Sequence, residues 1–96
     1  MIKKELVEQI AEETGFLSTD VRVVLQLALD KMVDALAQGK RIEFRDFGVF
    51  ETVQRRPRIG RNPSNPQQTY DVPARKVVRF KPGKMMKEKI DASQSA

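Results

Sequence analysis

The fold is decided by residues 54–76, which read QRRPRIGRNPSNPQQTYDVPARK. This stretch holds four prolines, six basic residues and one acidic residue, and its only sizeable apolar side chains are Ile59, Tyr70 and Val72. So few apolar groups cannot build a hydrophobic core. Because strand patterns flank the stretch on both sides, we expect a long hairpin arm that is mobile until it meets a partner, rather than a disordered linker.

Before the arm, apolar residues recur with a period of two. Ile42 and Phe44 alternate with charged residues, and after Gly48 a second apolar run extends to Val53. This period is typical of strands. We therefore expect strands over residues 41–53.

After the arm, residues 74–81 show the same period. Val78 and Phe80 fall on one face of the predicted strand. The opposite face carries three basic residues: Arg75, Arg79 and Lys81. Together the two segments predict a sheet with an apolar side and a basic side.

The chain ends with a short helical pattern. Pro82-Gly83 ends the last strand, and residues 83–90 are predicted to form a C-terminal helix. Residues 91–96, DASQSA, are expected to be a flexible tail.

The first part of the chain is helical. Residues 3–14 and 19–38 repeat apolar side chains at helical spacing. Gly15 and Gly39 are expected to end these two helices, and Ser18 to cap the second one.

The second helix has more apolar surface than one packed face needs. Its apolar stripe covers about 180°, against about 100° for a single packed face. The helix could be buried within its own small domain. However, about 70 residues remain without the arm, which is marginal for a lone domain. We therefore expect residues 1–38 to form a helical dimerisation base.

Charge is divided unevenly along the chain. Residues 1–38 hold four basic and seven acidic residues, whereas residues 39–90 hold 14 basic and five acidic ones. The net charges of these parts are −3 and +9, although the whole chain carries only +5. A basic half can serve solubility alone. Clustered arginine instead favours a polyanionic partner such as nucleic acid.

The absent residue types exclude several kinds of site. The sequence has no Cys and no His, which excludes disulfides, Cys/His zinc sites and Ser-His or Cys-His catalysis. No glycine pattern matches a phosphate-binding or dinucleotide-binding loop. We expect no metal, no cofactor and no small-molecule substrate. No apolar run is long enough to span a membrane and no secretory signal is recognisable, so a cytoplasmic protein is expected.

Four blocks of sequence follow one another in a recognisable order. They are Asp46-Phe47-Gly48-Val49-Phe50, Gly60-Arg61-Asn62-Pro63, Pro73-Ala74-Arg75 and Val77-Val78-Arg79-Phe80-Lys81-Pro82-Gly83-Lys84. With these blocks the chain, from Lys3 to Ile90, resembles the bacterial HU / integration host factor family of histone-like DNA-bending proteins.

The resemblance implies an α+β fold in a single domain over residues 1–96. It implies an intertwined dimer with a helical base, a β-sheet saddle, two protruding β-ribbon arms and a short C-terminal helix. Residues 54–73 would form the DNA-binding arm. The implied partners are double-stranded DNA in the nucleoid and a second copy of the chain. A related chain in a heterodimer remains an alternative.

The resemblance also implies the residues that contact DNA. Pro63 corresponds to the proline that wedges between base pairs. The implied contacts of the saddle and its flanks are Lys3, Arg79, Lys81, Lys84 and Lys87. Those of the arm are Arg55, Arg56, Arg58, Arg61, Asn62, Arg75 and Lys76.

The arm tip departs from the family pattern. It reads Ser64-Asn65-Pro66-Gln67-Gln68 and makes the arm one residue longer, so either Pro63 or Pro66 could be the wedge. A proline here could also simply prevent edge-to-edge strand pairing. The block Gly60-Arg61-Asn62 before Pro63 favours the wedge.

The function that follows is bending of duplex DNA with low sequence specificity, through phosphates and the minor groove. A site-specific bending factor of the integration host factor type is the main alternative. An RNA-binding module is a further one, with Phe47, Phe50 and Phe80 stacking on bases. The alternation of these rings with charged residues makes them core side chains instead. Nothing in the sequence favours an enzyme.

Overall fold

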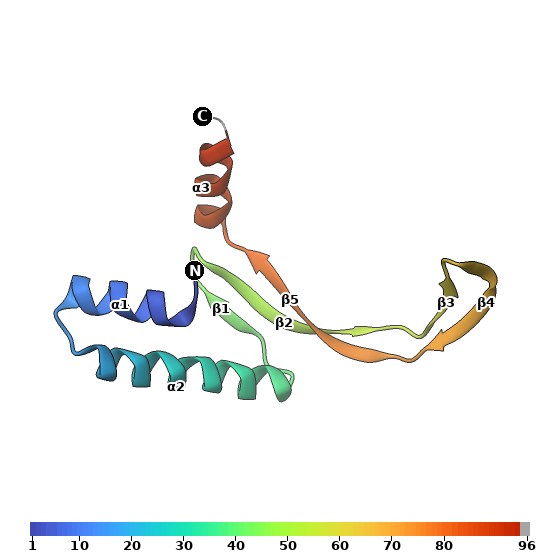
Figure 1. The fold of residues 1–96 in the computed structure, drawn as a ribbon, viewed down its shortest axis with the longest axis horizontal. Helices are drawn as coiled ribbons and strands as arrows, with labels where there is room; N and C mark the ends of the chain where they lie inside the picture. The colour runs from blue at the N-terminus through green and yellow to red at the C-terminus, as the bar shows by residue number, and fades with distance from the viewer. Residues whose placement is uncertain (95–96) are drawn as a thin grey trace.

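A computed structural model describes residues 1–94. Over these residues the fold is α+β, as predicted, with two helices, antiparallel strands and a C-terminal helix (Figure 1). The elements are α1 (Lys3–Thr14), α2 (Ser18–Ala37), β1 (Ile42–Phe44), β2 (Gly48–Arg55), β3 (Arg58–Asn62), β4 (Asn65–Val72), β5 (Arg75–Pro82) and α3 (Lys84–Gln94). None of the helices within residues 1–94 is long and apolar enough to cross a membrane.

Both helix ends lie at the predicted glycines. Gly15 has a φ of 75° and donates its backbone N–H to Ala11 O at 2.9 Å. Gly39 has a φ of 79°, and the next residue, Lys40, donates to Ala35 O at 3.0 Å. These left-handed conformations satisfy carbonyl groups that the helices leave without partners, and they suit glycine because it has no Cβ.

The predicted cap of α2 was wrong. The helix begins at Ser18 itself, one residue before the predicted start, and no side chain caps it. Leu17 is the N-cap, because its backbone is extended and its carbonyl accepts the first helical hydrogen bond from Val21 at 3.0 Å. The hydroxyl of Ser18 is therefore one position too late to act as the cap.

Strands β1, β2 and β5 form one antiparallel sheet in the order β1-β2-β5. The segment predicted over 41–53 is two strands, because the chain turns at Asp46, where φ is 68°. Strands β2 and β5 pair along their whole length, from Gly48 opposite Pro82 to Arg55 opposite Arg75. This long pairing continues the sheet towards the arm.

The arm is a separate two-stranded sheet of β3 and β4. Pro57 and Pro73 lie in the short breaks where β2 passes into β3 and β4 into β5. The arm extends away from the helices (Figure 1), and the molecule measures 60 × 38 × 27 Å. Its radius of gyration is 19.3 Å, against about 12–13 Å for a compact domain of this length.

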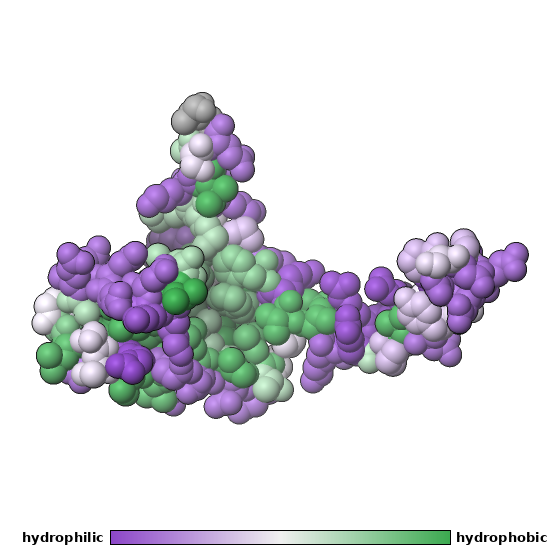
Figure 2. Space-filling model, viewed as in Figure 1, coloured by the Kyte–Doolittle hydropathy of each residue, from purple (hydrophilic) through white to green (hydrophobic). Residues whose placement is uncertain are grey.

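The chain has little core of its own. Among residues 1–94 only Val7 and Val21 are buried apolar side chains. Val24 and Val33 on α2 are 68% and 65% exposed. Hydrophobic surface is visible over the helices and the adjoining sheet (Figure 2). An apolar groove between α1 and α2 is lined by Ile10, Phe16, Val21, Val24, Leu25 and Ala28 with two polar residues.

The phenylalanines of the sheet and its first turn contact one another. The ring centroids of Phe50 and Phe80 are 4.7 Å apart, and those of Phe47 and Phe80 are 5.7 Å apart. Phe44 adds an edge-to-face contact with Phe47 at 6.3 Å. These rings contact one another, but Phe44, Phe47 and Phe80 are 37–49% exposed, so within this chain they are not buried core side chains as predicted.

The C-terminal helix is longer than predicted. α3 continues from Lys84 to Gln94 and projects away from the sheet (Figure 1). The expectation of a flexible tail is therefore wrong for residues 91–94, where Ser93 Oγ donates to Ile90 O at 2.6 Å. Residues such as Ala92 are compatible with a helix, and no glycine or proline interrupts the segment. The last two residues of the expected tail, 95–96, lie outside the described part of the chain.

Candidate nucleic-acid interface

The predicted basic face is one side of the β2–β5 ladder. Because alternate residues of a strand point to opposite sides, Arg75, Arg79 and Lys81 share one side of β5, and Phe80 lies on the other with Phe50 as its partner. The sheet thus separates the aromatic cluster from the basic residues. Lys76, also predicted to contact DNA, lies opposite Gln54 on the side of Phe80.

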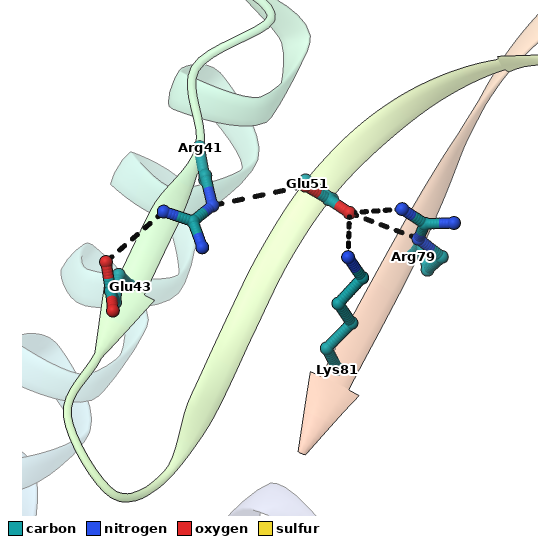
Figure 3. Close-up of polar contacts among 5 residues, drawn as sticks. All are labelled: Arg41, Glu43, Glu51, Arg79 and Lys81. Carbon is teal, nitrogen blue, oxygen red and sulfur yellow. Dashed lines mark hydrogen bonds and ion pairs between the residues drawn. The ribbon is translucent and has the colours of Figure 1, made fainter. Parts of the chain in front are cut away.

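A carboxylate that the sequence analysis missed lies within this basic face. Glu51 is the β2 partner of Arg79, which donates to Glu51 Oε1 from Nη2 at 2.5 Å and from Nε at 3.1 Å. Lys81 Nζ lies 3.3 Å from the same oxygen. Arg41 Nε lies 4.0 Å from Glu51 Oε2, and Arg41 Nη1 lies 3.3 Å from Glu43 (Figure 3).

These contacts change the acidity of Glu51. The hydrogen bond from Arg79, and then that from Lys81, lower the pKa of Glu51 below its ordinary value of 4.5. Glu51 is therefore ionised at neutral pH and neutralises part of the positive charge of Arg79 and Lys81. The resemblance implies that these two residues contact DNA, and such a contact would exchange the carboxylate for a phosphate.

This cluster could have been found in the sequence only by predicting how β2 and β5 pair. Glu51 and Arg41 occur in segments that the sequence analysis read only for their apolar period. Once β2 and β5 pair antiparallel, Glu51 stands directly opposite Arg79 and diagonally across from Lys81. Opposite charges at such positions attract each other.

The base of the arm concentrates arginine. Arg55 and Arg75 stand opposite each other, at the end of β2 and the start of β5. Like charges in directly opposed positions repel. Arg56 and Arg58 join Arg55 and Arg79 around a groove that also includes apolar residues of both strands. The structure thus brings predicted arm and saddle residues into one cationic groove.

The tip of the arm is a tight turn. Asn62 pairs with Asn65, so Pro63 and Ser64 alone connect β3 and β4. Both prolines are exposed, but Pro63 lies in the turn itself, whereas Pro66 lies within β4. Arg61 is the last residue before the turn that pairs in the regular register, opposite Thr69.

A glycine and a tyrosine pack the middle of the arm. Gly60 stands opposite Tyr70, and a Cβ at Gly60 would lie 2.4 Å from the Tyr70 ring. The ring therefore covers the glycine and packs within the ribbon. This contact occupies one side of Tyr70, although the residue is 56% exposed.

The remaining predicted contacts lie on helices. Lys3, at the start of α1, donates to the side chain of Gln26 on α2. Lys84 begins α3 and lies 3.9 Å from Glu88, one turn further along. Lys87 is in the first turn of the same exposed helix. Lys84 and Lys87 extend the positive charge beyond the sheet, while Lys3 connects the two N-terminal helices.

The sequence has close relatives among bacterial proteins. Residues 1–91 match the family model described as bacterial DNA-binding protein. Over 91 residues the chain is 50% identical to the probable DNA-binding protein HU of Chlamydia trachomatis, covering 95% of this chain and 91% of that protein. It is 44% identical over 93 residues to integration host factor subunit beta of Herminiimonas arsenicoxydans, covering 96% and 91%.

Solved structures agree with these relatives. The HU chain of the Anabaena HU–DNA cocrystal structure superposes with a TM-score of 0.85 at 34% identity, covering 94% of this chain and 97% of that one. HU from Thermotoga maritima gives a TM-score of 0.67 at 32% identity, covering 94% and 98%. This chain therefore belongs to the HU / integration host factor family of bacterial DNA-binding architectural proteins.

Proposed function

We propose that the protein associates with the bacterial nucleoid as a homodimer and bends duplex DNA with low sequence specificity. The basic face and the arm contact phosphates and the minor groove, and Pro63 inserts between base pairs. The observation that carries the proposal is the position of Pro63, exposed at the turn of a two-stranded ribbon that holds Arg58 and Arg61. Proline is a rigid apolar wedge, and unstacking one base step costs a few kcal/mol.

The phosphate contacts are proposed for the basic residues of the saddle and the arm. The groove at the arm base gathers four arginines, and Arg55 stands opposite Arg75 in the strand register, where two like charges favour a bound anion. Phosphate contacts position a protein on DNA without reading its sequence. This supports low specificity.

The homodimer is supported by the exposed apolar surface. Two buried apolar side chains among residues 1–94 do not stabilise a chain of this length, and the groove along α2 is open. A second copy that covers this groove would also place a second arm on the DNA. Two arms would give two kinks.

A site-specific bending function is the second candidate. It is favoured by the 44% identity to integration host factor subunit beta. The two functions are distinguished by competition, because a site-specific protein retains a labelled site against an excess of unrelated duplex, whereas a low-specificity protein does not.

The test is a titration of a duplex of about 35 base pairs, labelled at both ends, with energy transfer as the measure of bending. Pro63→Ala is compared with Pro66→Ala, a matched control in the same arm. We expect energy transfer to rise on binding, and Pro63→Ala to reduce this rise more than it reduces affinity. Pro66→Ala should bend DNA normally.

Other outcomes would overturn the proposal. If Pro66→Ala loses the bend and Pro63→Ala keeps it, the wedge is Pro66. If the protein binds without bringing the duplex ends closer, it coats DNA rather than bending it. Tighter binding to single strands or structured RNA than to duplex DNA would favour an RNA-binding role. Affinity should also fall steeply with salt, because each phosphate contact releases condensed counterions.

A further inference from the structure

We propose that Gln68 is a positioning residue for Pro63, acting through the side chain of Asn62. This inference rests on the proposed wedge and deepens it. It concerns how the arm tip presents the proline, and assigns a role to a residue that the sequence analysis noted only as part of an unusual tip.

The strand register changes at the tip. Arg61 pairs with Thr69, but the next residue, Asn62, pairs with Asn65. Pro66, Gln67 and Gln68 therefore form a bulge on β4, with no residue of β3 opposite them in the ladder. A bulge locally disrupts the ladder, and Pro66 has no backbone N–H to donate to it. The turn is thus weakly connected to the regular part of the arm.

The side chain of Asn62 compensates for this disruption. Its Oδ1 accepts a hydrogen bond from the backbone N–H of Ser64 at 2.9 Å, which closes the turn over Pro63. Its Nδ2 donates to Oε1 of Gln68, the last residue of the bulge, at 3.1 Å and so ties the bulge to β3. The two bonds together fix the plane of the Asn62 amide, so Gln68 holds the group that closes the turn.

This arrangement separates bending from affinity. Gln68 carries no charge and adds nothing to the electrostatic attraction of phosphates. Its hydrogen bond instead limits the conformations of the turn before DNA arrives, so less conformational entropy is lost when Pro63 enters the base stack. Loss of the bond should reduce the bend at saturation while leaving the affinity from phosphate contacts nearly unchanged.

Three variants of the full chain test this role. Gln68→Leu removes the acceptor and keeps a side chain of similar size. Gln68→Glu keeps an acceptor oxygen for Asn62 Nδ2 but adds a negative charge near phosphate. Gln67→Leu makes the same change as Gln68→Leu at the neighbouring bulge position, where the described contacts include no side-chain hydrogen bond. Each is measured with the end-labelled duplex beside Pro63→Ala.

We expect Gln68→Leu to lose most of the rise in energy transfer at saturation, with a dissociation constant within about twofold of the unchanged protein. Gln68→Glu should show the opposite pattern, a normal bend at saturation and weaker binding. Gln67→Leu should match the unchanged protein. In the absence of DNA, the Ser64 amide of Gln68→Leu should exchange with solvent faster, by at most about fivefold, because about fivefold corresponds to complete loss of its neutral hydrogen bond to Asn62.

The outcomes distinguish this role from the proposed wedge. If Pro63→Ala reduces the bend and Gln68→Leu does not, Gln68 has no positioning role and the wedge stands. If neither variant reduces the bend, the wedge itself is wrong and the positioning role fails with it. If Gln67→Leu and Gln68→Leu reduce the bend equally, the bulge needs polar side chains in general. An unchanged exchange rate of Ser64 in Gln68→Leu would also overturn the proposal.

Discussion

Arg79 and Glu51 stand opposite each other on β5 and β2, and two nitrogens of the guanidinium group donate to one carboxylate oxygen, at 2.5 and 3.1 Å. The same oxygen lies 3.3 Å from Lys81 Nζ. In the free protein, the two basic residues at the centre of the proposed saddle are thus paired with an internal anion. In the proposed complex, a DNA phosphate would have to compete with Glu51 for them.

Glu51→Gln should therefore tighten DNA binding. The substitution removes the competing charge and the repulsion between the carboxylate and phosphate, so affinity should rise several-fold. The gain is limited because Arg79 and Lys81 are half exposed to water, where ion pairs are weak. The measurement is the dissociation constant by fluorescence anisotropy at two salt concentrations. The matched control is Glu43→Gln, which removes a carboxylate whose ion pair among residues 1–94 is with Arg41. Equal gains in both variants would show a general charge effect.

The pH dependence of stability follows from the same carboxylate. The pKa of Glu51 is lowered from 4.5 by the hydrogen bond from Arg79 and then by that from Lys81. A lowered pKa stabilises the folded state above pH 4.5, and this contribution is lost as the pH falls through the lowered value. The free energy of unfolding of Glu51→Gln should therefore fall less on acidification than that of the unchanged protein, because the contribution of Glu51 ionisation is missing. An identical acid transition in the two proteins would contradict it.

DNA affinity should also depend on the titration of Glu51. When phosphates take Arg79 and Lys81, Glu51 loses its partners and its pKa rises towards 4.5. The complex then binds more protons than the free protein, so acidification favours binding. The advantage of Glu51→Gln should shrink as the pH falls below 4.5 and through the lowered pKa of the free protein, because a protonated Glu51 resembles glutamine. If the gain in affinity from Glu51→Gln stays constant with pH, Glu51 does not lose Arg79 and Lys81 to phosphate when DNA binds.

Gly48→Ala should destabilise the sheet. A Cβ at Gly48 would lie 2.5 Å from the Phe80 ring and 2.6 Å from Lys81 O, and φ is 157°. Overpacking of this kind costs about 1–3 kcal/mol. Gly39→Ala, where nothing lies within 4 Å of the new Cβ and φ is 79°, should cost only about 1–2 kcal/mol of left-handed strain. Denaturant unfolding measures both, and a smaller cost at Gly48 than at Gly39 would contradict the close packing against Phe80.

Thermal unfolding should depend on protein concentration. If a second copy covers Val24 and Val33, dissociation and unfolding are coupled, because the chain alone buries only Val7 and Val21 among residues 1–94. Mass action then raises the midpoint temperature as the protein is concentrated. Calorimetry over a hundredfold range of about 1–100 µM checks this. A midpoint independent of concentration would indicate a chain that is stable alone.

Much of the architecture could be predicted from local patterns. The first helix, the glycine stops at Gly15 and Gly39, and the hairpin nature of residues 54–73 each follow from a period or a residue type that acts over a few neighbours. The errors occurred where local rules compete. Leu17 rather than Ser18 caps α2, and α3 continues to Gln94.

The resemblance predicts that Arg79, Lys81 and Pro63 contact DNA, but it does not predict their side-chain pairings. It does not indicate that Glu51 neutralises Arg79 and Lys81, because Glu51 and Arg79, 28 positions apart, meet only through the β2–β5 register. Nor does it indicate that Asn62 is held by Gln68, because this bond depends on where the bulge falls in β4.

The sequence by itself determined the classes of structure and chemistry: helices from a period of 3.6, strands from a period of two, a basic half from its arginines, and an arm from a proline-rich stretch that has no core. These properties depend on interactions between near neighbours in the chain. Only the tertiary structure decided which charges Glu51 neutralises and which proline stands at the tip of the arm. Both depend on strand register, where a shift of one residue exchanges every partner and moves every side chain to the other face.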